Sequence, residues 1–130
     1  MKLEIQHIEI HVSSLDNARQ FYVDALGLDI LEEVPAINLL SVRAGGVRIS
    51  IFGGFKQKKQ MVHKTIGTHI IFKTGNLKES IETLQQRGII FSSPILEAPG
   101  FLKSICTSDP DGNLIEIAEY FRDPLLPQHS

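Results

Sequence analysis

The sequence predicts an α+β fold in which two β-α-β-β-β modules pair around one core. The chain has 130 residues, a length that suits a single domain. The same order of predicted strands and helix occurs in both halves, at a nearly constant offset. The landmarks that recur 62 positions apart are His7 and His69, Ser14 and Asn76, Leu15 and Leu77, and Ala18 and Ser80. Such a repeat indicates that neither half can bury its sheet alone.

The first half begins with an alternating strand and a capped helix. Polar and apolar residues alternate over residues 5–12, which is typical of a half-buried strand. Its polar face carries His7, Glu9 and His11. Ser14 is a suitable N-cap for the helix that follows, and Gly27 is placed to end it. Three more strands are predicted, over residues 29–34, 38–42 and 47–52.

The second half repeats this order. Residues 68–74 predict a strand, and Asn76 with Glu79 forms a capping box at the start of a helix that ends at Gly88. Strands are then expected over residues 89–91, 102–107 and 114–121, with a turn at residues 109–112 before the last one.

These elements divide the expected single domain, residues 1–130, into four parts. The two modules span residues 3–53 and 68–121. A polar and basic stretch over residues 54–67 is interpreted as a connector or a lid between them. A polar, proline-containing tail follows over residues 122–130.

Composition excludes several classes of protein. Hydrophobic residues make up 42% and charged residues 22% of the chain, as in ordinary globular proteins. The formal net charge of −2 offers no field that would attract nucleic acid or an anionic membrane. No run of about 18 apolar residues occurs, residues 1–10 lack the apolar stretch typical of a signal peptide, and the single Cys106 cannot form an intrachain disulfide. We therefore expect a cytoplasmic protein with neither a nucleic-acid nor a membrane partner.

Two histidines and one glutamate fall at corresponding points of the two modules. His7 lies in the first strand of one module, His69 in the first strand of the other, and Glu116 in the final strand. Two imidazoles and one carboxylate suit one divalent metal ion (Fe, Mn, Zn, Ni or Co) and leave coordination positions open for substrate. An open site indicates catalysis. The alternative is a polar network of the same residues without metal.

Three segments resemble those of the vicinal oxygen chelate superfamily: I-Q-H-I-E-I-H-V-S-S-L-D-N-A-R-Q-F-Y-V-D-A-L-G-L, G-T-H-I-I-F-K-T and D-P-D-G-N-L-I-E-I. This superfamily includes glyoxalase I, extradiol dioxygenases, methylmalonyl-CoA epimerase and fosfomycin-resistance proteins, and the resemblance covers roughly residues 3–121. It implies paired modules that form a curved mixed sheet, an open cup around one metal ion that binds two neighbouring substrate oxygens. It also implies that His7, His69 and Glu116 are the metal ligands. Ser50 falls where glyoxalase I has a fourth ligand, whereas a His/His/Glu set is what extradiol dioxygenases and manganese-dependent fosfomycin thiol transferases use.

Five further residues are candidates for the substrate site. Glu9 and His11 share the polar face of the first strand and are expected to take or transfer a proton. Lys73 shares the face of the second module's histidine. Arg48, in phase with Ser50, is suited to pair with a substrate carboxylate. For all five, the alternative is an ordinary solvated or hydrogen-bonded side chain on an exposed strand face.

The sequence thus predicts a metal-dependent enzyme that acts on a small-molecule substrate with vicinal oxygens, and that forms a homodimer. The reaction is expected to be that of a glyoxalase-like lyase or isomerase, or of an extradiol-type dioxygenase. Two alternatives stay open: a non-catalytic module that binds a drug or metabolite, as bleomycin-resistance proteins do, and a thiol transferase that acts on an epoxide antibiotic.

Overall fold

The computed structural model describes residues 1–56 and 69–122. Residues 123–130 of the expected tail and residues 57–67 of the expected connector lie outside the described residues. The chain divides into two compact units, one formed by residues 1–63 and 109–112, and the other by residues 64–108 and 113–130. In the described part of the chain, no helix has the length and apolar character needed to span a membrane.

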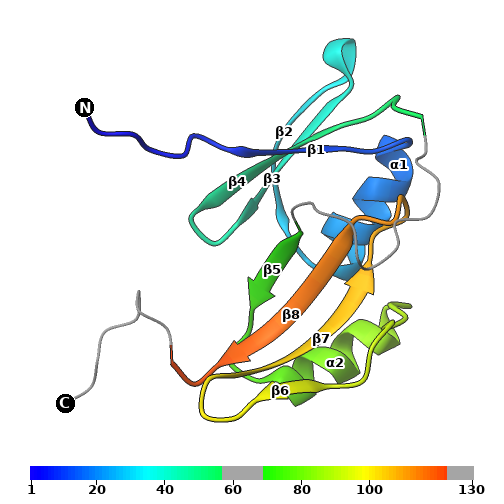
Figure 1. Ribbon diagram of the computed structural model, residues 1–130. Helices are drawn as coiled ribbons and strands as arrows, with labels where there is room; N and C mark the ends of the chain where they lie inside the picture. The colour runs from blue at the N-terminus through cyan, green and yellow to red at the C-terminus, as the bar shows by residue number, and fades with distance from the viewer. Residues whose placement is uncertain (57–68, 123–130) are drawn as a thin grey trace. The chain divides into compact units, whose positions relative to one another are not determined.

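The first unit has the predicted order of elements. Strand β1 (Ile8–His11) is followed by helix α1 (Leu15–Ala18), which continues as the π-helix η1 (Arg19–Ala25). Three strands and a short 3-10 helix follow: β2 (Asp29–Val34), η2 (Pro35–Ile37), β3 (Leu39–Ala44) and β4 (Val47–Phe52). The sheet order is β1-β4-β3-β2, with β1 parallel to β4 and the other pairs antiparallel (Figure 1).

Local signals in the sequence explain where this helical segment begins and ends. Ser14 has an extended backbone, and its hydroxyl accepts a hydrogen bond from the Asn17 N–H at 3.2 Å. Gly27 has a positive φ of 76°, and its N–H donates to the Val23 carbonyl. Both residues act as predicted. The difference from the expected regular helix is the π-helical spacing of residues 19–25.

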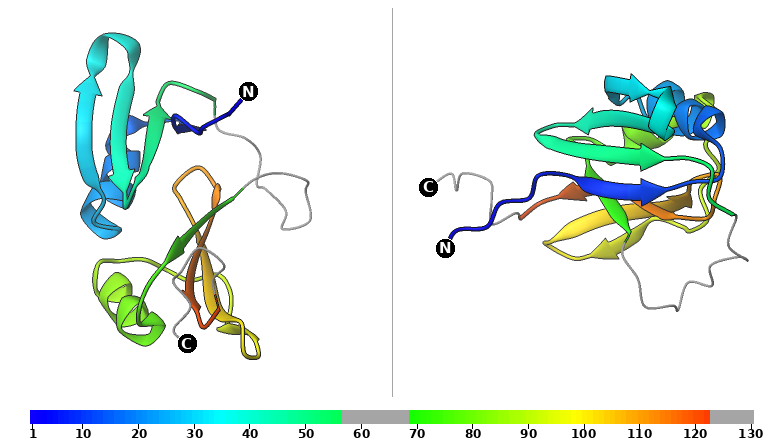
Figure 2. Two further views of the ribbon diagram at one scale, coloured as in Figure 1. Left: turned by 90° about the vertical axis from the view of Figure 1, so that its left-hand side faces the viewer. Right: turned by 90° about the horizontal axis from the view of Figure 1, so that it is seen from above.

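The second unit repeats the pattern. Its elements are β5 (Ile70–Lys73), α2 (Leu77–Gln86), β6 (Leu96–Ala98), β7 (Leu102–Ser108) and β8 (Leu114–Tyr120). The sheet order is β5-β8-β7-β6, with β5 parallel to β8 and the other pairs antiparallel (Figure 2). The Asn76 side chain accepts from the Glu79 N–H at 3.1 Å, as the capping box predicts. The α+β class and the doubled β-α-β-β-β order are therefore confirmed.

The predicted strand over residues 89–91 is wrong, because side-chain hydroxyls replace the backbone ladder there. The Thr107 hydroxyl donates to the Ile90 carbonyl at 2.8 Å, and the Cys106 N–H donates to the Ser93 hydroxyl at 3.0 Å. Pro94 then follows, and it has no N–H to donate. The strand at this edge of the sheet is instead β6, seven residues further along the chain.

In the first sheet, the pairing register separates an apolar face from a polar face. Ile10 lies opposite Ile51, and Ile51 lies opposite Leu40, so these buried side chains share the apolar face. Glu9 lies opposite Ser50, and Ser50 opposite Ser41, on the other face. The candidate residues of the first module are therefore on the side of the sheet away from this apolar core.

Candidate metal centre and acid–base pair

A row of polar side chains crosses the first sheet. The register places Glu9, Ser50, Ser41 and Glu32 opposite one another on neighbouring strands. Ser50 is 3% exposed and Ser41 is fully buried. The Arg48 guanidinium donates to the Ser41 hydroxyl at 2.9 Å and to a Glu32 carboxylate oxygen at 2.8 Å. Arg48 is thus held along this row with its charge balanced by Glu32.

Glu9 and His11 form a hydrogen-bonded pair on the same face. The distance from His11 Nε2 to Glu9 Oε2 is 2.7 Å, and both side chains are about half exposed. A carboxylate accepts hydrogen bonds, so Nε2 carries the proton that it donates to Glu9. In the neutral imidazole the other nitrogen, Nδ1, then has the free lone pair.

The ring of Phe55 stacks on the His11 imidazole. The ring centroids are 4.1 Å apart and the planes differ by 1°. Phe55 is held near the end of β1 because its N–H donates to the Val12 carbonyl at 3.1 Å. The imidazole is therefore fixed by a hydrogen bond at its edge and by a stacked ring on its face. We did not predict Phe55 from the sequence, since it lies in a glycine-flanked stretch without periodicity.

His7 is an exposed residue immediately before β1. Its Nδ1 contacts the side-chain oxygen Oε1 of Gln6. A neutral imidazole has one ring nitrogen with a free lone pair, which a metal ion can take as a ligand.

His69 and Glu116 lie on one face of the second sheet. In parallel strands β5 and β8, Ile71 is opposite Glu116, and His69 is two residues before Ile71. Lys73, two residues after Ile71, is on the same face and is exposed. The opposite face of β8 carries Glu119, whose carboxylate accepts from the N–H of Leu77 at the start of α2. His69 and Glu116 therefore point away from that helix.

Cys106 lies directly opposite Glu116 in the antiparallel pair of β7 and β8. Its thiol donates to Glu116 Oε1 with a sulfur-to-oxygen distance of 3.6 Å. Burial raises the pKa of the Cys106 thiol, and the nearby Glu116 carboxylate raises it further. The thiol is therefore a hydrogen-bond donor to a predicted metal ligand. We did not predict this contact from the sequence, because it depends on the cross-strand register.

The donor atoms of the predicted ligand set suit a divalent metal ion. His7 offers an imidazole nitrogen, and the second sheet offers an imidazole and a carboxylate on one face. One of these three residues belongs to the first unit and two belong to the second. Among residues 1–56 and 69–122, no three His, Cys, Asp or Glu side chains are grouped so as to hold a metal ion.

The register also shows where the two sheets differ in potential metal ligands. Glu9 lies two residues after His7 and opposite Ser50, just as Ile71 lies two residues after His69 and opposite Glu116. Ser50 therefore occupies the position in β4 that Glu116 occupies in β8. A serine hydroxyl is a poor ligand for a divalent ion, so β4 offers no good ligand at the position where β8 offers Glu116.

A separate buried cluster joins the D-P-D-G turn to the first unit. The Tyr22 hydroxyl donates to Asp109 Oδ2 at 2.7 Å, and the Ser13 N–H donates to Asp111 Oδ2 at 3.0 Å. Asp111 also donates its N–H to Asp109 Oδ1 at 2.9 Å. Burial raises the pKa of Tyr22, and Asp109 raises it further. The turn thus holds the start of α1 in addition to reversing the chain.

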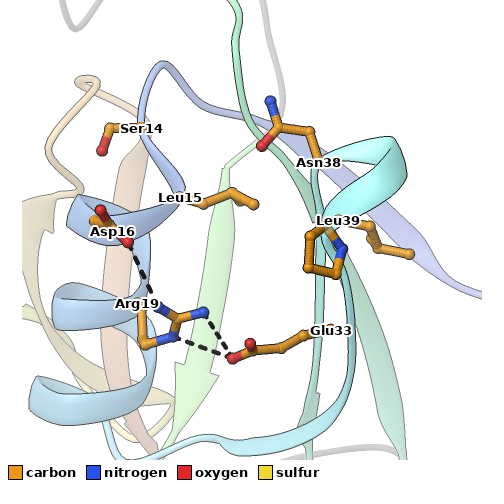
Figure 3. Close-up of a pocket in the computed structure, with 8 residues that line it drawn as sticks. Ser14, Leu15, Asp16, Arg19, Glu33, Asn38 and Leu39 are labelled. Carbon is orange, nitrogen blue, oxygen red and sulfur yellow. Dashed lines mark hydrogen bonds and ion pairs between the residues drawn. The ribbon is translucent and has the colours of Figure 1, made fainter.

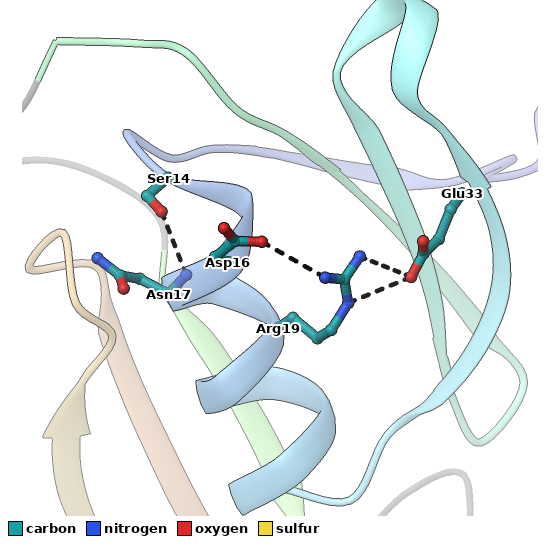
Figure 4. Close-up of polar contacts among 5 residues, drawn as sticks. All are labelled: Ser14, Asp16, Asn17, Arg19 and Glu33. Atoms are coloured by element: carbon teal, nitrogen blue, oxygen red, sulfur yellow. Dashed lines mark hydrogen bonds and ion pairs between the residues drawn. The ribbon is translucent and has the colours of Figure 1, made fainter.

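A hollow of about 320 Å³ lies in the first unit between α1 and the segment from β2 to β3 (Figure 3). Arg19 donates to Glu33 at 2.7 and 3.2 Å, and contacts Asp16 at 3.5 Å (Figure 4). Two carboxylates against one guanidinium make this wall unsuitable for an anion. The residues that line the hollow are Ser14, Leu15, Asp16, Arg19, Glu33, Pro35, Asn38 and Leu39. It therefore includes none of the predicted site residues.

The fold defines a class of protein built from two β-α-β-β-β modules. The family model of the glyoxalase/bleomycin resistance protein/dioxygenase superfamily matches residues 4–117, and the chain belongs to this superfamily. Members of this superfamily commonly use a divalent metal ion and act on small molecules.

The chain is similar to two dioxygenases and to a glyoxalase family protein of known structure. Over 118 residues it is 27% identical to biphenyl-2,3-diol 1,2-dioxygenase 3 of Rhodococcus globerulus, a match that covers 87% of this chain and 61% of that protein. A 42-residue stretch is 48% identical to catechol-2,3-dioxygenase of Bacillus subtilis, covering 32% of this chain and 15% of that protein. The crystal structure of a glyoxalase family protein from Enterococcus faecalis is 27% identical, with a TM-score of 0.71, and the match covers 89% of this chain and 97% of that one. The chain thus spans less than two thirds of each of the two dioxygenases.

Proposed function

We propose that this protein is a metal-dependent dioxygenase that opens the ring of a catechol-like vicinal diol in the extradiol manner. The observation that supports this proposal most is the donor set: two histidines and one carboxylate, with Ser50 at the position of a fourth ligand. Such a set with open positions is characteristic of non-heme iron oxygenases. The similarity to two dioxygenases that act on vicinal diols favours the same reaction class.

In this proposal His7, His69 and Glu116 hold one divalent ion, of which Fe or Mn suits oxygen chemistry best. When bound, the ion supplies Lewis-acid polarisation of the two substrate oxygens and the redox capacity that dioxygen chemistry needs. The residues of this chain supply ligands, orientation and proton transfer. Ser50, Arg48 and Lys73 are the proposed substrate contacts; Arg48 is held in place by Ser41 and Glu32.

Glu9 is the proposed proton acceptor. Strand geometry advances about 3.3 Å per residue, so the Cα of Glu9 lies about 7 Å and that of His11 about 13 Å from the Cα of His7. Glu9 is therefore the member of the pair within reach of a diol held beside His7. Its Oε1 takes the hydroxyl proton while Oε2 accepts from His11 Nε2. His11 orients the carboxylate through this hydrogen bond, and Glu9, which is itself about half exposed, then releases the proton to solvent.

Oxygen uptake tests this proposal. The full chain, loaded with Fe(II) or Mn(II), should consume one O₂ per molecule of catechol or biphenyl-2,3-diol, because both oxygen atoms enter the ring-opened product. Glu116→Gln should lose this uptake, whereas the control Glu97→Gln, on the exposed strand β6, should keep it. Metal-loaded protein that binds these diols without consuming O₂ would contradict the proposal.

A glyoxalase-like lyase or isomerase is the second candidate, and the Glu9–His11 pair favours it as well. A carboxylate beside a metal-held carbonyl is suited to remove a proton from the neighbouring carbon. This reaction needs no oxygen. Turnover of an α-oxo substrate under nitrogen, lost in Glu9→Gln, would identify this reaction in place of the dioxygenase.

A further inference from the structure

Cys106 and Glu116 are a cross-strand pair in the second sheet. Side chains directly opposite one another in an antiparallel pair lie on the same face, with their Cβ atoms about 5 Å apart. The thiol sulfur is 3.6 Å from Glu116 Oε1. Because the carboxylate oxygen only accepts, the thiol is the donor. One of the two carboxylate oxygens is therefore engaged within the sheet.

The backbone of Cys106 is hydrogen-bonded to the segment between α2 and β6. Its N–H donates to the Ser93 hydroxyl at 3.0 Å, and its carbonyl accepts from the Ser92 N–H at 2.8 Å. The side chain is 9% exposed. Burial limits the rotamers that the thiol can adopt, so its hydrogen bond to Glu116 restricts the orientation of the carboxylate.

We propose that Cys106 is a positioning residue that holds Glu116 Oε1 and turns Oε2 toward the metal ion. This inference rests on the proposed function, in which Glu116 is a ligand. Cys106 is not a ligand itself, because its thiol keeps the proton that it donates to the carboxylate, and only a deprotonated thiol ligates a metal ion. Hydrogen bonds to metal-ligating carboxylates fix the ligand before the ion arrives, and their loss typically lowers metal affinity by about 10- to 100-fold.

The first part of the test uses the metal-free full chain. Cys106 is the single cysteine of the sequence, so the infrared spectrum contains one S–H stretching band. This band should lie at lower frequency in the wild type than in Glu116→Ala, in which the acceptor is absent. In Ser104→Ala, two residues away on the same face of β7, it should not move. The same frequency in wild type and Glu116→Ala would overturn the inference.

The second part measures the affinity of the full chain for Mn(II) and Co(II) by calorimetry. Cys106→Ala should weaken binding about tenfold or more, Cys106→Ser should keep most of it, and Ser104→Ala should match the wild type. Unchanged affinity in Cys106→Ala would overturn this inference alone. A sulfur-to-cobalt charge-transfer band would also overturn it, by showing that the thiol is a ligand. A wild type that binds neither ion would overturn the proposed function as well.

Discussion

Glu9 and His11 meet because a two-residue step along a strand returns a side chain to the same face. The short distance between them makes one acid–base unit from two residues that would each be ordinary on an exposed strand. Neither side chain packs into the apolar core, and because both are about half exposed, both are accessible to solvent.

Glu9→Gln tests the proton transfer. The amide keeps the shape of the side chain but loses the basic oxygen, so kcat should fall about 100-fold or more while KM changes only a few-fold. Steady-state kinetics on metal-loaded protein, with metal content measured for both proteins, would show this. An unchanged kcat would exclude Glu9 as the proton acceptor.

Phe55 is expected to hold the His11 ring in place. Phe55→Leu removes the stacked ring but keeps apolar bulk, so the ring protons of His11 should lose the upfield shift that stacking produces. Phe55→Tyr should preserve it. Proton NMR of the metal-free chain measures both variants, and identical His11 shifts in all three proteins would show that the stack does not exist in solution.

Tyr22 stabilises the first unit through its buried hydrogen bond to Asp109. Tyr22→Phe removes the donor and should lower the free energy of unfolding by about 1–3 kcal/mol, as measured by urea denaturation at pH 8. The raised pKa of Tyr22 adds a pH dependence. The folded state keeps the phenol proton when the unfolded chain loses it near pH 10, so this stabilisation is complete below about pH 10 and decreases above it. A gap between wild type and Tyr22→Phe that does not narrow above pH 10 would contradict this account.

The strands and helix caps were predictable where the residues of the segment itself determine its structure. Residues 29–34 and 47–52 form strands with the predicted bounds, and Ser14 and Asn76 cap their helices as expected. The strand at residues 89–91 was not predictable, because hydroxyl groups that come together only in the folded sheet decide its backbone.

The candidate site divides in the same way. Period-two alternation correctly placed Glu9 and His11 on one face, and the repeat placed Ser50 opposite the first strand as Glu116 is in the second unit. The contact between Cys106 and Glu116 was beyond the sequence, because it needs the register of β7 with β8. Whether His7, His69 and Glu116 share one ion stays a prediction.

Gly53, directly after β4, lies so close to Leu15 of α1 that a side chain has no room there. A Cβ at this position would lie 2.8 Å from Leu15 Cγ and 3.2 Å from Asn38 Oδ1. Gly53→Ala should therefore lower the free energy of unfolding by about 1–3 kcal/mol through overpacking. Gly46→Ala is the matched control, because a Cβ there meets nothing within 4 Å. Equal thermal stability of the two variants would contradict this reading of the contact.

For the molecule as a whole, the repeat explains the fold, and the comparison of its two copies shows where the potential metal ligands differ. Each unit presents a parallel strand pair with a polar face, and one of these faces carries Glu116 where the other carries Ser50. In the proposed function the first unit supplies one ligand, His7, and the second unit supplies the other two, His69 and Glu116. The expected homodimer is a separate prediction, which sedimentation velocity of the full chain would test.

Metal content tests the central claim most directly. Full-length protein purified without chelator, and then reconstituted with Fe(II) or Mn(II), should contain about one ion per chain by mass spectrometry. His7→Ala and Glu116→Ala should each lose it, whereas Ser50→Ala should keep it, because a serine at this position is not a ligand. An ion retained in both ligand variants, or no ion bound by the wild type after reconstitution, would contradict the account.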